Sequence, residues 1–249
     1  DHHYLFPPDK GIDMIDQEIH AAREIGVRFH PTRGSMTLGE EQGGLPPMTV
    51  VEKDDRVLED YERLVTTYHD PSPYSMVRIA LAPCAPFNVT EHLFQETVTI
   101  ARNHGVRLHT HLAETDDEDD FCITKFGKRP FQYVADLGWE GSDVWFAHCV
   151  KINSEEIGRF AESGIGVAHC PSANCRLGSG VAPIPEMLRA GVPVGLGVDG
   201  SASNDSGDLL GEARLALLLH RSRWGVESIT PRDCLWMLTR GGAAVLGND

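Results

Sequence analysis

The chain has few of the features that mark a nucleic-acid-binding, membrane-spanning or disulfide-stabilised protein. Its 249 residues contain 22 Lys and Arg against 37 Asp and Glu, and the formal net charge of −15 argues against phosphate backbones and anionic lipids as partners. The six cysteines include no CxxC pair and are too sparse to staple a chain of this size. The longest apolar runs, such as residues 215–219, are too short to cross a bilayer. We therefore expect a cytoplasmic protein with reduced thiols.

A junction from helix to strand repeats along the chain. It occurs at EIGVRF (24–29), NHGVRL (103–108), ESGIGV (162–167) and RAGVPV (189–194). Each Gly suits the left-handed position just past a helix end, and each apolar run after it suits a strand buried on both faces. The expected first helix carries apolar residues at helical spacing, namely Ile12, Ile15, Ile19 and Ala22. Asn153 and Glu156 predict a capping box at the start of another helix. Alternating helices and strands predict a parallel sheet.

Six buried strands follow from this pattern. They are expected at residues 27–31, 77–83, 106–111, 144–149, 166–171 and 194–199. Six parallel strands fit either an open doubly wound sheet or most of an eight-stranded barrel. Nearly every strand carries His, Cys or Asp at or next to its carboxyl end, at the edge where barrel enzymes assemble their sites, and no GxxxxGK[ST] phosphate loop is present. We therefore predict an α/β fold, a TIM-like (β/α)8 barrel over residues 1–249, with DHHYLFP at the start as the end of a further strand.

Several of these strand ends carry residues that bind metals. His111 is the last residue of the inward-facing side of its strand, and His148, His169 and Asp199 lie at or near the carboxyl ends of three other strands. A single histidine in such a place is more often a hydrogen-bonded core residue than a ligand, but several at matched strand ends favour a metal site. Asp199 follows the apolar run VGLGV, where a carboxylate is costly to bury unless a cation meets it. The alternative for Asp199 is a cap for the next helix.

Other polar residues near the strand ends are candidates for catalysis and substrate binding. Glu114, three residues after His111, suits a proton shuttle beside a metal, although it also begins the acidic run ETDDEDD, which suits a solvated surface. Arg33 has the geometry to donate paired hydrogen bonds to a purine, or else forms an ion pair. Asn174 and Asn204 line a pocket or brace loops. The residues alone leave these alternatives open.

The motifs HTHLAET, FAHCV, TRGGAAVLG and the segment from AHCPSANC to GVDGSASND resemble the amidohydrolase superfamily, in its branch of guanine, 8-oxoguanine and s-triazine deaminases. DHHYLFP, RFHPTRGSM and GEEQGGLPPMTVVE are similar to the subgroup of 8-oxoguanine deaminase and hydroxyatrazine-type aminohydrolases. The resemblance implies His111 as a metal ligand, Asp199 as a ligand and base, Glu114 as an acid/base, and His148 as the group that orients the attacking water. It also implies one divalent metal ion per chain, zinc first and iron second.

The chain departs from the family pattern in one respect. The family supplies two further ligands from an HxH motif on the first barrel strand, and no such motif precedes Asp1. We expect a segment of a longer protein, without the first strand and the small β-rich domain. The activity expected is hydrolytic deamination of 8-oxoguanine to urate and ammonia. The alternatives are a guanine or s-triazine aminohydrolase and a non-catalytic, metal-free scaffold, with a purine-like or triazine small molecule as the partner and a homodimer as one option.

Overall fold

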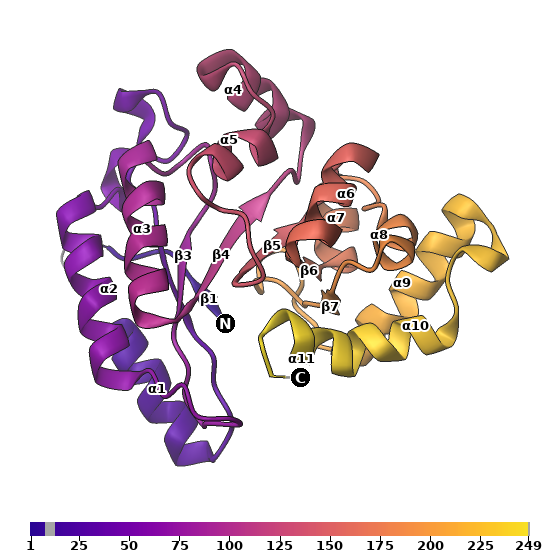
Figure 1. Cartoon of the computed structure of the whole chain (residues 1–249), viewed down its shortest axis with the longest axis horizontal. Coiled ribbons are helices and arrows are strands. Elements are labelled where there is room, and N and C mark those ends of the chain that lie inside the picture. Colours follow the sequence, from indigo (N-terminus) through magenta and orange to yellow (C-terminus); the bar gives the residue numbers. More distant parts are fainter. Residues whose placement is uncertain (8–12, 249) are drawn as a thin grey trace. The chain divides into compact units, whose positions relative to one another are not determined.

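The computed structural model describes residues 1–7 and 13–248, which fall into two compact units (Figure 1). Unit 1 comprises residues 1–110 and 134–139, and unit 2 comprises residues 111–133 and the residues from 140 onward. In the described part of the chain no helix is long and apolar enough to cross a membrane. Ile12, placed on the first helix by its spacing, lies outside the described residues.

Unit 1 alternates parallel strands with helices. Its strands are β1 (His2–His3), β2 (Thr32–Ser35), β3 (Ala80–Pro83) and β4 (Arg107–Leu112), which pair in this order and of which β4 ends in unit 2. Its helices are α1 (Met14–Ile25), α2 (Asp54–Tyr68) and α3 (Glu91–His104), with short 3-10 turns η1 (Glu40–Gln42) and η2 (Met48–Val50). Figure 1 shows α2 and α3 side by side. The strand-helix alternation predicted from the sequence is therefore present in this unit.

At the first predicted junction, residues 24–29, the helix ends where the sequence predicts, but the strand begins later than predicted. Helix α1 buries Ile15, Ile19 and Ala22 and ends at Gly26, whose φ of 80° is left-handed as expected. The strand predicted at residues 27–31 instead forms at β2, after Pro31. Val27 and Arg28 are exposed, and only Phe29 makes an isolated parallel bridge, to Val77. Pro31 has no amide hydrogen to donate, so a continuous ladder begins only beyond it.

Unit 2 continues the same alternation. Its strands are β5 (Val144–His148), β6 (Gly166–His169) and β7 (Val194–Leu196), all parallel and paired in this order. Its helices are α4 (Asp116–Phe126), α5 (Pro130–Asp136, which ends in unit 1), α6 (Ser154–Ser163), α7 (Pro171–Leu177), α8 (Ile184–Ala190), α9 (Leu209–Trp224), α10 (Pro231–Trp236) and α11 (Gly242–Val245), with a 3-10 turn η3 (Val226–Ser228) and a π-helical turn η4 (Met237–Gly241). Figure 1 shows α6 beside α8.

The local signals predicted for unit 2 are confirmed. The Asn153 side chain accepts from the Glu156 amide at 3.0 Å, and the Glu156 carboxylate accepts from the Asn153 amide at 2.9 Å, which is the predicted capping box of α6. Helices α6 and α8 both end at a left-handed glycine. The core of this unit includes a cluster of three buried aromatic rings, Phe131, Phe146 and Phe160.

Strand β7 is held by glycines of the segment that follows α10. A Cβ atom on Gly241 would lie 2.1 Å from the Val194 carbonyl oxygen, and a Cβ atom on Gly195 would lie 2.8 Å from Gly242 Cα. Both distances are far below a van der Waals contact, so η4 and the start of α11 approach β7 more closely than any side chain permits.

Each unit is a parallel α/β arrangement. Closure into a barrel and a single domain over residues 1–249 stay predictions.

Candidate active site

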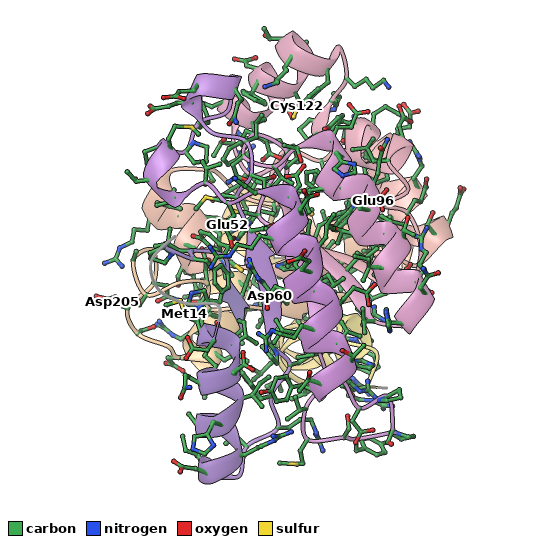
Figure 2. All side chains as sticks on the ribbon, turned by 90° about the vertical axis from the view of Figure 1, so that its left-hand side faces the viewer. Met14, Glu52, Asp60, Glu96, Cys122 and Asp205 are labelled. Atoms are coloured by element: carbon green, nitrogen blue, oxygen red, sulfur yellow. The ribbon has the colours of Figure 1, made fainter. Side chains whose placement is uncertain are left out.

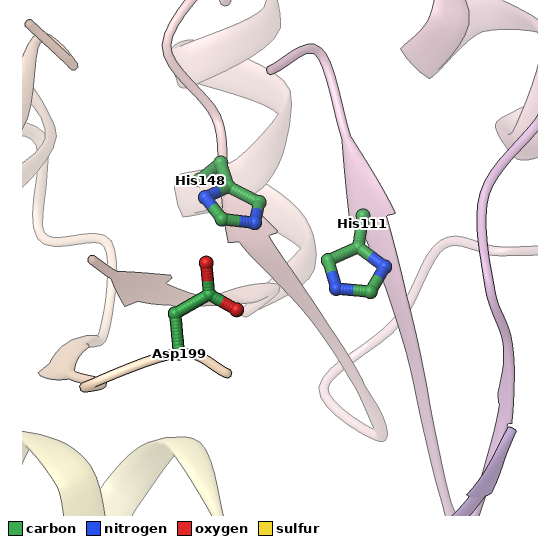
Figure 3. A group of neighbouring side chains, drawn as sticks. All are labelled: His111, His148 and Asp199. Carbon is green, nitrogen blue, oxygen red and sulfur yellow. The ribbon is translucent and has the colours of Figure 1, made fainter. Parts of the chain in front are cut away.

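Three strand ends of unit 2 bring His111, His148 and Asp199 together (Figure 3). His111 is the penultimate residue of β4, His148 is the last residue of β5, and Asp199 follows β7. One possible ligand atom from each residue lies within 4.8 Å of those of the other two. Two imidazoles and a carboxylate are a donor set that suits zinc and related divalent ions, so these residues fit the metal that the sequence predicts.

The backbone at these strand ends is unusual. Ala113, His148, Cys149 and Asp199 have φ angles of 50°, 69°, 50° and 64°, in the left-handed region that residues other than Gly rarely adopt. Such conformations persist where the surroundings over-determine them. Here the Cys149 amide donates to the Leu112 carbonyl at 3.1 Å and the Lys151 amide donates to the Ala113 carbonyl at 2.8 Å. These two hydrogen bonds tie the turn that follows His111 to the turn that carries His148.

The orientation of His148 is set by Asn174. His148 is buried, and its Nδ1 lies 2.8 Å from the Asn174 Oδ1 atom on α7. An amide oxygen only accepts, so Nδ1 carries a proton and Nε2 keeps its lone pair in the neutral ring. The ring also stacks on His111, with centroids 5.4 Å apart. Asn174 therefore orients His148, a role that was not predicted from the sequence. Its predicted role in substrate binding stays a prediction.

Glu114 directs its carboxyl group at the same histidine. Its Oε2 atom lies 3.7 Å from His148 Nε2, while its Oε1 atom accepts a hydrogen bond from the buried Ser179 hydroxyl at 3.1 Å. The carboxylate and the lone pair of Nε2 are both acceptors, so a favourable contact between them needs a shared proton or a donor placed between them. The Glu114 side chain is 21% exposed, which leaves it within reach of a ligand. Ser179 was not anticipated from the sequence.

Asp199 is held by the loop that it begins. Its carboxylate accepts from the Gly200 amide at 2.8 Å and from the Ser203 hydroxyl at 2.9 Å. The buried Asn204 amide group donates to the Val198 carbonyl and to Glu212, both at 2.9 Å. The cap of helix α9 is Asp208, so Asp199 is not a helix cap in this structure. Asn204 therefore braces the loop, and its predicted contact with substrate is untested.

Arg33 lies on β2 in unit 1, in a buried network of ion pairs. Its guanidinium group donates to Asp60 at 2.9 Å and to Glu52 at 2.8 and 2.9 Å, and it also bonds the Gly34 carbonyl. Asp60 also accepts a hydrogen bond from a second cation, because Arg63 Nε donates to its Oδ1 atom at 2.9 Å. Glu52 and Asp60 are labelled in Figure 2. These contacts correspond to the ion-pair alternative for Arg33, while its predicted role in substrate binding stays a prediction.

His169 pairs with another histidine and is not among the three candidate ligands. Its Nε2 atom lies 3.1 Å from Nε2 of His220 on α9, whose ring stacks on Trp224. Both histidines are fully buried, and burial lowers the pKa of His169 well below its usual value and that of His220 to about 4. The pair therefore stays neutral and packs in the interior of unit 2.

Comparison with known proteins supports the relationship that the motifs suggest. The sequence profile of the amidohydrolase family matches residues 3–249. The chain belongs to the amidohydrolase family. Among curated relatives, this amidohydrolase is 50% identical to 8-oxoguanine deaminase of Pseudomonas aeruginosa over 248 residues, which is 99% of this chain and 55% of that protein. It is 41% identical to hydroxydechloroatrazine ethylaminohydrolase of a Pseudomonas species, over 99% of this chain and 51% of that protein.

Solved structures agree with this assignment. The chain superposes on atrazine chlorohydrolase of Arthrobacter aurescens, solved in complex with zinc, with a TM-score of 0.95 and 42% identity, covering 100% of this chain and 55% of that one. The chain thus spans about half the length of the relatives that it matches. The predicted membership of the amidohydrolases is confirmed.

Proposed function

We propose that the full-length protein is a metal-dependent hydrolase that removes an amino group from an N-heterocycle, with 8-oxoguanine as the first candidate substrate. The observation that carries this proposal is the convergence of His111, His148 and Asp199, with the Glu114 carboxyl 3.7 Å from His148. The 50% identity to an 8-oxoguanine deaminase favours that substrate. The relationship to a hydroxydechloroatrazine ethylaminohydrolase makes an s-triazine the second candidate, and guanine is the third.

His111 and Asp199 would hold one divalent ion, with zinc first because a relative was solved with it and iron second. When bound, such an ion supplies a nucleophilic water at neutral pH by lowering the pKa of that water. Asp199 is suited to accept the proton of the water, because its carboxylate belongs to the same group of three and is held by Gly200 and Ser203. His148 would orient the water through Nε2, since Asn174 holds its other nitrogen.

Glu114 would deliver a proton to the ring nitrogen beside the carbon under attack. Protonation there prevents negative charge from building up on the ring as the carbon becomes tetrahedral. Ser179 fixes one carboxyl oxygen and leaves the other facing His148, which is the arrangement required of a group that moves a proton within the site. The Asn174 Nδ2 donor is buried without a hydrogen-bond partner among the described residues, and we assign it to a substrate acceptor. Arg33 and Asn204 stay further candidates for substrate binding.

The test is ammonia release by the full-length, zinc-loaded protein from 8-oxoguanine, guanine, isocytosine and a hydroxytriazine, with the zinc content measured on the same sample. We expect about one metal per chain, as activation of water by a single ion requires, and a preference for 8-oxoguanine. A preference for the hydroxytriazine would instead support an s-triazine, the second candidate substrate. Bound metal without turnover of any of the four would refute the substrate class, and absence of both metal and turnover would favour a non-catalytic scaffold.

Two variants separate metal binding from proton transfer. Glu114→Gln is expected to keep the zinc and lose turnover, because the amide holds the shape of the side chain but cannot donate an acidic proton. His111→Ala is expected to lose both zinc and turnover. Full activity of Glu114→Gln would show that another group moves the proton.

A further inference from the structure

The start of helix α4 departs from a pattern seen twice elsewhere in unit 2. Thr115 and Glu118 have the spacing of a capping box, and the Thr115 hydroxyl does accept from the Glu118 amide at 3.3 Å. In the capping boxes of α6 and α10 the acidic side chain returns to the amide of the cap residue itself. In α4 the carboxyl group of Glu118 passes the cap residue. It bonds the two amides before it, in the segment that carries Glu114.

Both oxygens of Glu118 are used on this segment. Oε1 accepts from the Ala113 amide at 2.9 Å and Oε2 accepts from the Glu114 amide at 2.8 Å. Ala113 is the residue with the left-handed φ of 50° that turns the chain from β4 toward Glu114. The carboxyl group therefore fixes two consecutive peptide units at a residue with a left-handed backbone. A change there would move the Glu114 side chain.

Glu118 has no cation to offset its burial. Its exposure is 2%, and among the described residues no Lys, Arg or His forms an ion pair with it, although Arg129 pairs with the adjacent Asp119 and with Glu156. Burial raises the pKa of Glu118 to about 8, and the two amide hydrogen bonds oppose this rise. A buried carboxyl group without a cation costs stability. Helix capping alone does not explain that cost, because Thr115 already caps α4.

We propose that Glu118 is a positioning residue, which holds the turn at Ala113 and thereby keeps the Glu114 carboxyl group beside His148. This inference rests on the proposed function, in which Glu114 transfers a proton. A carboxyl group has an acceptor lone pair on each oxygen in either protonation state, whereas glutamine presents an NH2 donor in place of one oxygen. Glu118→Gln thus keeps the volume of the side chain but sets a donor against one of the two amides.

Glu156 offers a matched control. It is also a buried glutamate in the third position of a helix, and it also accepts from a backbone amide, but its partner is Asn153 and its ion pair is with Arg129. None of these contacts reaches Glu114. Glu156→Gln is therefore expected to lower thermal stability and to leave kcat within about twofold of the parent, whereas Glu118→Gln should lower kcat about 10- to 100-fold, as the loss of supporting contacts around a metal site does.

The experiment uses the full-length, zinc-loaded protein and compares the parent, Glu118→Gln and Glu156→Gln. It measures kcat and KM for 8-oxoguanine, zinc per chain, and hydrogen–deuterium exchange of peptides spanning residues 109–121. We expect Glu118→Gln to retain zinc, to lose more in kcat than in KM, and to exchange faster in this segment alone. If Glu118→Gln does not fold, Glu118→Asp replaces it, because the shorter carboxyl group reaches only one of the two amides.

Three results would overturn the inference. They are a kcat of Glu118→Gln within twofold of the parent, loss of zinc together with activity, and unchanged exchange across residues 109–121. If the parent turns over none of the substrates, the proposed function fails first. The exchange measurement then still decides whether Glu118 holds the turn, because it needs no turnover.

Discussion

Replacement of Arg33 by Met tests whether its buried ion pairs hold unit 1 together. Arg33 is 1% exposed, and the Glu52 and Asp60 side chains that it contacts are 5% and 1% exposed. Without Arg33, Asp60 keeps its contact with Arg63, but Glu52 loses the cation that the described residues give it. Leaving one buried carboxylate without its partner costs about 3–5 kcal/mol in the free energy of unfolding. For a protein of this size the thermal midpoint should fall by roughly 10 °C.

The assay is thermal unfolding of the zinc-loaded protein, run beside KM for the preferred substrate. The double variant Arg33→Met, Glu52→Gln removes the charge that the single variant leaves unpaired, so it should recover most of the lost midpoint. An unchanged midpoint in Arg33→Met together with a raised KM would refute this reasoning. That result would instead assign Arg33 to substrate binding, the role considered for it from the sequence.

Two further predictions concern buried side chains of unit 2. Asn174→Leu removes the acceptor for His148 Nδ1, so kcat/KM should fall about 10- to 100-fold while zinc content is retained, and an unchanged kcat/KM would contradict the assigned orientation of His148. Because the pKa of folded His220 is lowered to about 4, the unfolded chain binds protons more tightly. Stability should therefore fall as pH drops from about 6.5 toward 4, and His220→Gln should make the thermal midpoint less sensitive to pH in that range.

Local signals in the sequence predicted most of the architecture. Glycines after apolar helices located the helix ends, and the spacing of Asn153 and Glu156 located a cap, because these features depend on residues near one another in the chain. The strand at residues 27–31 was displaced, because Pro31 delays the ladder to β2, and the strands predicted at 77–83, 166–171 and 194–199 are two or three residues shorter in the structure. The division into two units was not anticipated. It depends on contacts between distant segments, which no local pattern reports.

The proximity of His111, His148 and Asp199 could be expected from the sequence, whereas the contacts that support these residues could not, and their roles stay predictions. His111, His148 and Asp199 lie at or just after strand ends, which parallel topology brings to one edge, but the same argument also selected His169, which pairs with His220. The partners Ser179 and Asn174 come from segments far along the chain, and their contacts with Glu114 and His148 require three-dimensional packing. The Thr115–Glu118 spacing did offer a signal. It predicts a helix start correctly but not the reach of the Glu118 carboxyl group to Ala113.

The close approach of η4 to β7 restricts which residue position 241 of this chain can accept. A methyl group at Gly241 would have to occupy the space of the Val194 carbonyl oxygen, so accommodation would require β7 itself to shift. Asp199 lies three residues after the end of β7, and a displaced strand would carry this carboxylate away from His111 and His148. Position 241 is thus closed to every side chain because the backbone of β7 already occupies that space, and the geometry of the candidate site depends on this packing.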